Sequence, residues 1–325
     1  MPLGEFQLIQ RFFQHHDRGG HVVLGVGDDA ALVEVPAGFE LAVAVDTLVE
    51  GVHFPRSAAP GDIGYKALAV NLSDLAAMGA EPVWATLALT LPASDEQWLE
   101  RFAGGLYDAA DAHGVSLIGG DTTRGPLTIT VQVGGHVPAG SALRRSGARV
   151  GDQIWVSGTL GDAALVLKHE LGESLLPGDV YHRLASRLHR PAPRVALGKA
   201  LREVATAAID ISDGLAADLG HLLTASGVGA TLRVERLPLS DAARASLAGE
   251  EPWRIALAGG DDYELCFTVP ARRGEQVQRL SRETGVAVTR IGLVEEQPGL
   301  RGRRENGVAV ELEESGYEHF ADLGP

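Results

Sequence analysis

The chain has 325 residues, enough for two domains of ordinary size with substantial cores. Acidic residues outnumber basic ones by 43 to 28, and the net charge of −15 argues against a surface for nucleic acids or anionic membranes. The chain has a single cysteine, so an intrachain disulfide is excluded. This residue, Cys266, lies in the apolar run LCFTV. No apolar run reaches the length of a membrane span, about 18 residues, and the start MPLGEFQLIQRFF lacks a basic stretch followed by an apolar one. We therefore expect a cytoplasmic protein.

The first half of the chain is expected to mix short strands and helices without strict alternation. Apolar runs bounded by turn residues predict strands at 21–26, 31–35, 41–45, 83–91, 115–120 and 127–137. Helical spacing and capping residues predict helices at 5–16, 62–78 and 95–113, the last opened by the capping box Ser94–Gln97. Because the order is irregular, an α+β fold is favoured over a doubly wound sheet.

The helix that starts at Asp62 is apolar on both long faces, which is typical of a buried helix. Asp62 is expected to cap its beginning, and Gly79 to close its end. Asp74 falls on one of the apolar stripes, where a carboxylate has to be paired, hydrogen-bonded or bound to a metal. A pair with Lys66, or a cap on a neighbouring loop, is the simplest alternative to a metal ligand.

A glycine-rich, basic segment from Pro138 to Gly151 is expected to separate two domains, residues 1–140 and 150–325. The second half is predicted to contain strands at 152–158, 207–212, 230–234, 264–269 and 286–294. Its predicted helices lie at 159–171, 194–204, 213–226 and 275–284, and the remaining residues form a polar, acidic tail.

Aspartates recur at glycine turns, at strand ends and on the buried helix: Asp28, Asp29, Asp46, Asp74, Asp121, Asp210, Asp213, Asp261 and Asp262. Each one alone is more often a turn former or a helix cap than a ligand. Together they indicate Mg²⁺ rather than zinc, because these hard oxygen donors are not accompanied by a His or Cys cluster. Neither an EF-hand loop nor a GxxxxGK[ST] motif is present, and GVGDDA lacks the third glycine of a dinucleotide fingerprint.

An acidic site of this kind would repel a nucleoside triphosphate unless several Mg²⁺ ions bridge its phosphates to the carboxylates. A few specific cations should then assist: Lys66, Arg124, Arg144 and Arg145 are the candidates. For the arginines, a position in a solvated loop is the alternative.

Several segments together resemble the thiamine-monophosphate kinase family, in the family's order and over nearly the whole chain: GEFQLIQRFF, GVGDDAAL, VDTLVEGVHF, YKALAVNLSDLAAMGAEP, LIGGDTTRG, RSGARVGD, IDISDGLAADLGH and GGDDYELCFTV. The resemblance implies transfer of phosphate from ATP to thiamine monophosphate, giving thiamine diphosphate by a direct in-line reaction. It implies a two-domain, aminoimidazole ribonucleotide synthetase-like α+β fold. The N-terminal domain, a mixed sheet with helices, would bind ATP and Mg²⁺ and form a homodimer by sheet packing, and the C-terminal α+β domain would complete the nucleotide and substrate site.

The resemblance also implies roles for individual residues. Several Mg²⁺ ions would be held by Asp29, Asp46, Asp74, Asp121, Asp210 and Asp213. The nucleotide would contact Gly120, Asp121, Arg145 and Ser212, and thiamine monophosphate would contact His53, Asp261 and Tyr317. Asp74 and Asp121 are the expected catalytic residues, while Asp28 and Asp262 are left with structural roles.

The chain departs from the family's pattern at two places. Ala44 and Val45 stand where the family usually carries hydroxyl residues, so only a backbone carbonyl could contact a metal there. Asp261 stands where the family has a glutamate, and its side chain is shorter by one methylene.

Three other functions remain open on the sequence. One is a relative in the same superfamily that spends ATP on another acceptor. The second is a nucleotide-binding regulatory protein that binds Mg²⁺ and ATP without turnover. The third is a metal-dependent phosphatase, which would release inorganic phosphate whether or not thiamine monophosphate is present.

Overall fold

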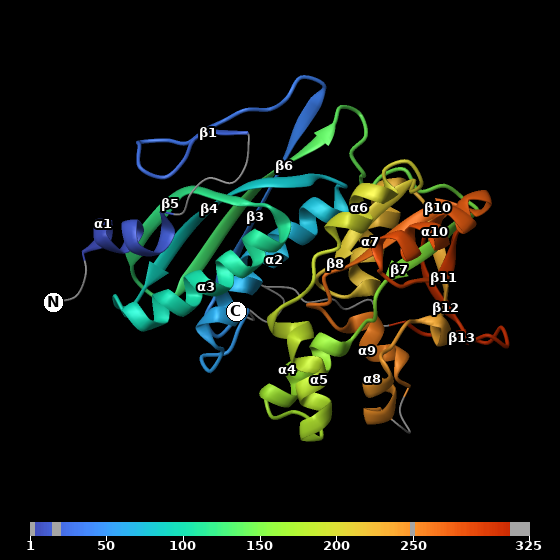
Figure 1. Cartoon of the computed structure of the whole chain (residues 1–325). Coiled ribbons are helices and arrows are strands. Elements are labelled where there is room, and N and C mark those ends of the chain that lie inside the picture. Colours follow the sequence, from blue (N-terminus) through green and yellow to red (C-terminus); the bar gives the residue numbers. More distant parts are fainter. Residues whose placement is uncertain (1–3, 15–20, 248–250, 313–325) are drawn as a thin grey trace, which may run out of the picture. The chain divides into compact units, whose positions relative to one another are not determined.

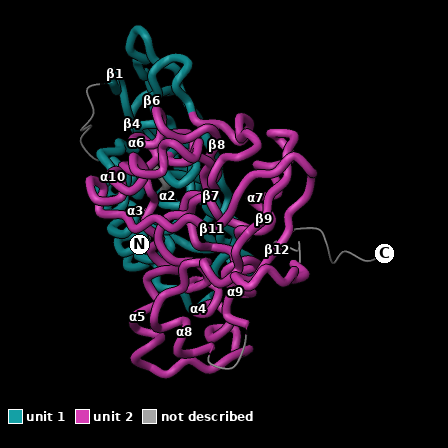
Figure 2. Tube along the Cα trace, turned by 90° about the vertical axis from the view of Figure 1, so that its right-hand side faces the viewer, with its two compact units in different colours: residues 1–75, 80–142 teal, residues 76–79, 143–325 magenta. Residues whose placement is uncertain are grey.

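Two large sheets and one two-stranded sheet organise the part of the chain that the computed structural model describes, residues 4–14, 21–247 and 251–312. They belong to two units, coloured separately in Figure 2. Unit 1 comprises residues 1–75 and 80–142, and unit 2 comprises residues 76–79 and 143–325. Each unit combines a sheet with helices, so the predicted α+β class is confirmed.

The sheet of unit 1 has four strands in the order β3-β6-β4-β5. Its strands are β3 (Phe39–Val49), β4 (Glu81–Leu91), β5 (Ser116–Arg124) and β6 (Thr128–Pro138). Strand β6 is antiparallel to both of its neighbours, whereas β5 runs parallel to β4, so the sheet is mixed. The hairpin of β1 (Val22–Leu24) and β2 (Leu32–Val33) packs through Val22 and Val33 on a small cluster around Trp84.

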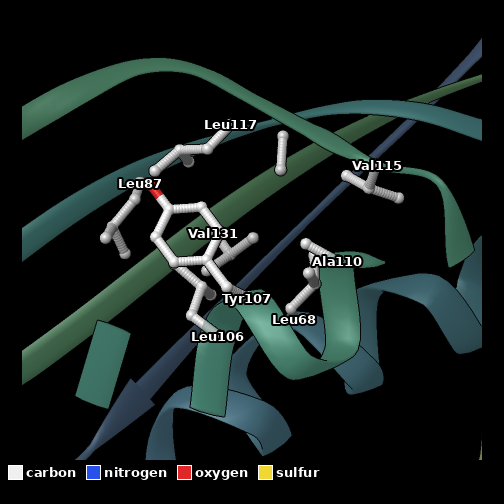
Figure 3. A pocket seen from close by; sticks show the side chains of 9 residues that line it. Leu68, Leu87, Leu106, Tyr107, Ala110, Val115, Leu117 and Val131 are labelled. Carbon is white, nitrogen blue, oxygen red and sulfur yellow. The ribbon is translucent and has the colours of Figure 1, made fainter. Parts of the chain in front are cut away.

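Helices α2 (Pro60–Ala77) and α3 (Glu96–His113) pack on one face of this sheet (Figure 1). Figure 3 shows Leu68 of α2 and Leu106 of α3 beside Leu87 and Val131 of the strands. The gap that these side chains leave has a volume of about 10 Å³, at most the size of one water molecule. It is a packing gap in the core, too small for a substrate. The remaining described helices of this unit are short: α1 (Glu5–Leu8) and the π-helix η1 (Ile9–Phe13).

The two long helices begin at residues other than the predicted caps. Helix α2 starts at Pro60, which is tolerated in a first turn because its missing N–H would have no helical partner there. Helix α3 is capped by Asp95 rather than Ser94, because the Asp95 carboxylate accepts hydrogen bonds from the backbone N–H groups of Gln97 and Trp98, at 3.0 and 3.1 Å.

The sheet of unit 2 has seven strands in the order β13-β12-β9-β11-β7-β10-β8. All neighbours are antiparallel except the parallel pair β9 and β12. The strands are β7 (Asp152–Ser157), β8 (Ala207–Ile211), β9 (Gly229–Arg233), β10 (Glu264–Pro270), β11 (Val288–Glu295), β12 (Gly299–Arg303) and β13 (Ala309–Val310).

The helices of unit 2 are α4 (Asp162–Glu170), α5 (Gly178–His189), α6 (Val195–Leu201), α7 (Leu215–Ser226), α8 (Asp241–Ser246), α9 (Trp253–Ala258) and α10 (Gly274–Thr284), with 3₁₀ turns η2 (Val234–Arg236) and η3 (Ala271–Arg273). Helices α4, α5 and α7 bury their apolar sides with β7 and β8 in one core that also contains Cys266. Helices α5, α8 and α9 lie outside the predicted elements. Strands β12 and β13 lie in the segment that was expected to be a polar tail. That prediction is therefore wrong for residues 299–303 and 309–310.

Candidate functional site

The two glycines before Asp121 lie within strand β5, so the predicted glycine turn at this place is wrong. Gly120 has φ of 153°, and a Cβ at this position would lie 1.8 Å from the carbonyl oxygen of Leu87 on β4. Only glycine fits this conformation and this close approach. Asp121, on the same edge strand, is exposed. The backbone therefore presents an accessible carboxylate at a fixed place.

Asp46 lies on the opposite edge strand of the same sheet. It pairs with Val131 of β6, which pairs with Leu87 of β4, which pairs with Gly120 of β5. Two strands thus separate Asp46 from Asp121, and three inter-strand spacings amount to about 14 Å. This is the spacing of the strands along the sheet, and the roles of Asp46 and Asp121 as metal ligands stay predictions.

The other candidates of unit 1 lie on a helix and in loops. Asp74 is half-buried near the end of α2, on a helix whose Lys66 is only 4% exposed. Asp29 is exposed in the segment after β1, where its N–H donates to the Asp28 carboxylate at 2.9 Å. His53 is half-buried, and its Nδ1 accepts the N–H of Val49 at 3.0 Å. In the neutral ring the proton therefore resides on Nε2.

In unit 2, strand β8 ends at a group of three carboxylates. Asp210 is buried in the strand, and Asp213 follows it in the turn. Asp218, in the first turn of α7, accepts the N–H groups of Ser212 and Asp213 at 3.0 and 3.1 Å. Burial, followed by the charges of Asp210 and Asp213, raises the pKa of Asp218 to about 7. Negative charge is therefore concentrated where the predicted ligands Asp210 and Asp213 lie.

Because the pKa of Asp218 is raised on folding, we expect protein free of Mg²⁺ to lose stability as the pH rises. The unfolded carboxyl ionises near 3.8, whereas the folded one keeps its proton to about 7. Between these values the folded state binds more protons, so stability falls with rising pH, by about 2–4 kcal/mol in total. Thermal unfolding of wild type and Asp218→Asn at pH 5 and pH 8, in EDTA, measures this change.

The asparagine variant keeps an acceptor for both N–H groups but cannot ionise. We expect its melting temperature at pH 8 to exceed that of the wild type, and the difference to shrink at pH 5. Equal pH dependence in the two proteins would contradict the assigned pKa.

A strained loop between α9 and β10 contains Asp261. Its N–H donates to the carbonyl of Ser212 at 2.8 Å, and the N–H of Tyr263 donates to the carbonyl of Ile211 at 2.8 Å. A Cβ on Gly260 would lie 2.5 Å from the Ser212 carbonyl oxygen. The loop is therefore attached to the same turn that carries Asp213.

Asp262 has a structural place, as predicted. It is 2% exposed, and its carboxylate oxygens accept the N–H of Gly161 at 2.9 and 3.0 Å, at the N-terminus of α4. Burial raises the pKa of Asp262 well above its usual value, although the Gly161 bond acts in the opposite direction.

A buried ion cluster next to this loop lies outside the sequence predictions. Glu264, which is fully buried, accepts hydrogen bonds from Arg194 at 2.5 and 2.6 Å and from Arg187 at 2.8 Å. Ser157 of β7 donates a further bond to it at 2.5 Å. The two arginines lie 70 and 77 residues before Glu264, so only the motif YEL, which places a charge at the start of an apolar strand, could have drawn attention to it.

Arg145 belongs to a segment fixed by backbone contacts within unit 2. The N–H of Ala208 on β8 donates to the carbonyl of Arg144 at 2.9 Å, and the Ser226 hydroxyl at the end of α7 donates to the carbonyl of Arg145 at 3.0 Å. The Arg145 residue itself is exposed. Tyr317 lies outside the described residues.

No group of three or more His, Cys, Asp or Glu side chains forms a ready-made metal centre within residues 4–14, 21–247 and 251–312. This is compatible with Mg²⁺, which keeps several waters and is commonly held by one or two carboxylates together with substrate phosphates. In the same ranges no helix is long and apolar enough to cross a membrane.

Comparison with known proteins identifies the family. Residues 27–137 match the N-terminal domain of AIR synthase related proteins, and residues 149–305 match their C-terminal domain. Thiamine-monophosphate kinase of Salmonella typhimurium is 48% identical over 99% of both chains. The crystal structure of thiamine-monophosphate kinase from Stenotrophomonas maltophilia has a TM-score of 0.85 at 47% identity, covering 95% of this chain and 99% of that one.

A further solved structure, AaThiL complexed with AMPPCP and TMP, has a TM-score of 0.78 at 35% identity, covering 97% of this chain and 96% of that chain. The chain is thus an AIR synthase related protein, with both domains of that fold. Within this class it belongs to the thiamine-monophosphate kinase family.

Proposed function

We propose that this chain transfers the γ-phosphoryl group of ATP to thiamine monophosphate, producing thiamine diphosphate and ADP. The observation that carries the proposal is the whole-chain match to thiamine-monophosphate kinases, at 48% identity over 99% of both chains. The related AaThiL binds AMPPCP, an analogue of ATP, together with TMP. A superfamily relative acting on another acceptor is less well supported, because both matched domains are common to AIR synthase related proteins, whereas the 48% identity over 99% of both chains is to a thiamine-monophosphate kinase.

The predicted site residues would bind the metal ions and the two substrates. Asp29, Asp46, Asp74 and Asp121 on unit 1, and Asp210 and Asp213 on unit 2, are proposed ligands of several Mg²⁺ ions. Bound Mg²⁺ would neutralise the charge of the transferring phosphoryl group. Gly120, Asp121, Arg145 and Ser212 are proposed to contact the nucleotide, and His53, Asp261 and Tyr317 to contact thiamine monophosphate.

The chain's own residues supply mainly position and charge. The acceptor oxygen belongs to a phosphate that is already anionic at neutral pH, so the reaction needs no strong general base. Holding both substrates in line removes most of the entropic part of the barrier. Rigid elements are suited to holding them, since Gly120 fixes Asp121 against β4, and Asp218 fixes the turn of Ser212 and Asp213.

Incubation of the purified chain with ATP, Mg²⁺ and thiamine monophosphate, followed by chromatography, tests the function. We expect thiamine diphosphate and ADP to appear in equal amounts, and both to disappear in EDTA. ADP without thiamine diphosphate would indicate another acceptor. Inorganic phosphate released without thiamine monophosphate would indicate a phosphatase, and ATP binding without products would indicate a regulatory protein.

We propose further that the protein is a homodimer. Alternate residues of β3 expose large apolar side chains on one face: Phe39 42%, Leu41 38%, Val43 50% and Val45 57%. Residues i and i+2 of a strand share a face, so these four form a continuous stripe suited to packing against another sheet. Sedimentation equilibrium should give twice the chain mass for the wild type and less for Val45→Glu; a monomeric wild type at micromolar concentration would oppose the proposal.

The proposed location is the cytoplasm, where ATP is available as a substrate. Cell fractionation followed by immunoblotting tests it, and recovery of the protein outside the cytoplasmic fraction would contradict it.

A further inference from the structure

Two non-glycine residues in the described part of the chain have positive φ, and both lie in the loop before β10. Asp261 has φ of 66° and Tyr263 has φ of 49°. Side chains rarely adopt this left-handed backbone, and it persists only where the surroundings enforce it. Here the enforcement is visible, because the N–H groups of both residues are bonded to carbonyls at the end of β8.

With this backbone, the side chain of Asp262 points away from those of its neighbours Asp261 and Tyr263. Asp262 turns into the core and caps the N-terminus of α4 through Gly161. Asp261 and Tyr263 are half-buried, and the Tyr263 hydroxyl donates to Oδ1 of Asp261 at 3.1 Å. Asp261 and Tyr263 therefore contact each other although Asp262 lies between them in the sequence. This contact depends on the positive φ values of both residues.

We propose that Tyr263 is a positioning residue, which holds the Asp261 carboxylate in the orientation that binds thiamine monophosphate. The proposal rests on the proposed function and on the role proposed there for Asp261. A short aspartate has fewer rotatable bonds than a glutamate, and a hydroxyl donor removes part of the freedom that remains. The substrate carries a thiazolium cation and an amino group, both of which an oriented carboxylate can recognise.

The same loop is bonded to the turn of Ser212 and Asp213. A change at Tyr263 that removes only the hydroxyl leaves these backbone bonds in place. Its effect should therefore fall on the affinity for thiamine monophosphate and leave the nucleotide untouched.

Steady-state kinetics of Tyr263→Phe test the proposal. We expect KM for thiamine monophosphate to rise about tenfold, which corresponds to about 1.4 kcal/mol. The kcat and KM for ATP should stay within about twofold. In an Asp261→Asn background, the same substitution should raise KM by much less, because the charged acceptor is already gone.

Tyr181→Phe is the matched control. Its hydroxyl donates to Oε1 of Glu170 at 2.8 Å, so it loses the same kind of bond on α5 without altering Asp261. The proposal would be overturned by an unchanged KM for thiamine monophosphate in Tyr263→Phe. It would also be overturned if this substitution raised KM equally in the wild type and in Asp261→Asn. In either case an active wild type would still support the proposed function. A wild type that forms no thiamine diphosphate would overturn both.

Discussion

Asp121→Asn is expected to lower kcat about 10³-fold while the protein stays folded. This corresponds to about 4 kcal/mol of lost transition-state stabilisation, the scale on which a metal ligand contributes. The substitution keeps the shape of the side chain and removes its charge. Asp121 is exposed on an edge strand, so the core gains no cavity and no buried unpaired group.

The comparison variant is Asp108→Asn, an exposed aspartate on α3 of the same unit. It removes one negative charge without touching the proposed ligands, and its kcat should stay within about twofold of the wild type. Titration with Mg²⁺ should show that, of the two variants, only Asp121→Asn needs a higher Mg²⁺ concentration than the wild type for half-maximal activity. Normal turnover in that variant would remove Asp121 from the catalytic residues.

Glu264→Gln is expected to destabilise unit 2 by about 3–5 kcal/mol, the cost of breaking a buried ion pair by removing one partner. The carboxylate serves two guanidinium groups and a serine hydroxyl, all at 2.8 Å or less. The glutamine amide has an N–H₂ group where the carboxylate had an acceptor oxygen, so at least one donor loses its partner. Arg187 and Arg194 also lose the negative charge that balances them. For a unit of this size the melting temperature should fall by about 8–15 °C.

Asp179→Asn provides the control, because Asp179 forms an exposed ion pair with Arg183 on α5 at 2.9 Å. Exposed helical pairs contribute about 0.3–0.5 kcal/mol, so this variant should melt within about 2 °C of the wild type. Hydrogen exchange at β10 separates unfolding of unit 2 from that of unit 1. Similar melting of Glu264→Gln and Asp179→Asn would show that the buried cluster contributes little.

Local patterns predicted the elements whose signals lie close together in the sequence. The all-round apolar character of 62–78 gave the buried helix α2, and Gly79 follows it with φ of 65°, as its predicted closing role requires. Regular alternation gave β6, and the aspartate and glycine motifs gave the family. Helix α2 starts two residues before its predicted cap Asp62, and α3 is capped one residue after Ser94, because neighbouring serine, aspartate and proline residues compete for the same place.

Contacts between distant residues could not be predicted in this way. The partners of Glu264 lie 70, 77 and 107 residues away, and the run ELCFTV gives no sign of them. The positive φ of Asp261 and Tyr263 is held by bonds to Ser212 and Ile211 at the end of β8, and a tyrosine rarely adopts that backbone by itself. Tertiary bonding overrides local preference at this loop.

For the candidate metal ligands, too, the sequence indicates the residues but not their arrangement in space. The sequence selects aspartates at turns and strand ends, but it does not order the strands. Only the sheet order places Asp46 and Asp121 at opposite edges, about 14 Å apart across β6 and β4. Their roles as metal ligands stay predictions.

Anomalous diffraction from crystals grown with Mn²⁺ and a non-hydrolysable ATP analogue tests the central claim, that these aspartates ligate divalent cations. Mn²⁺ takes the same oxygen ligands as Mg²⁺. The account predicts anomalous peaks at about 2.1 Å from carboxylate oxygens of Asp46 and Asp121. Further peaks are predicted at Asp29, Asp74, Asp210 and Asp213. Cations bound only away from these carboxylates would contradict it.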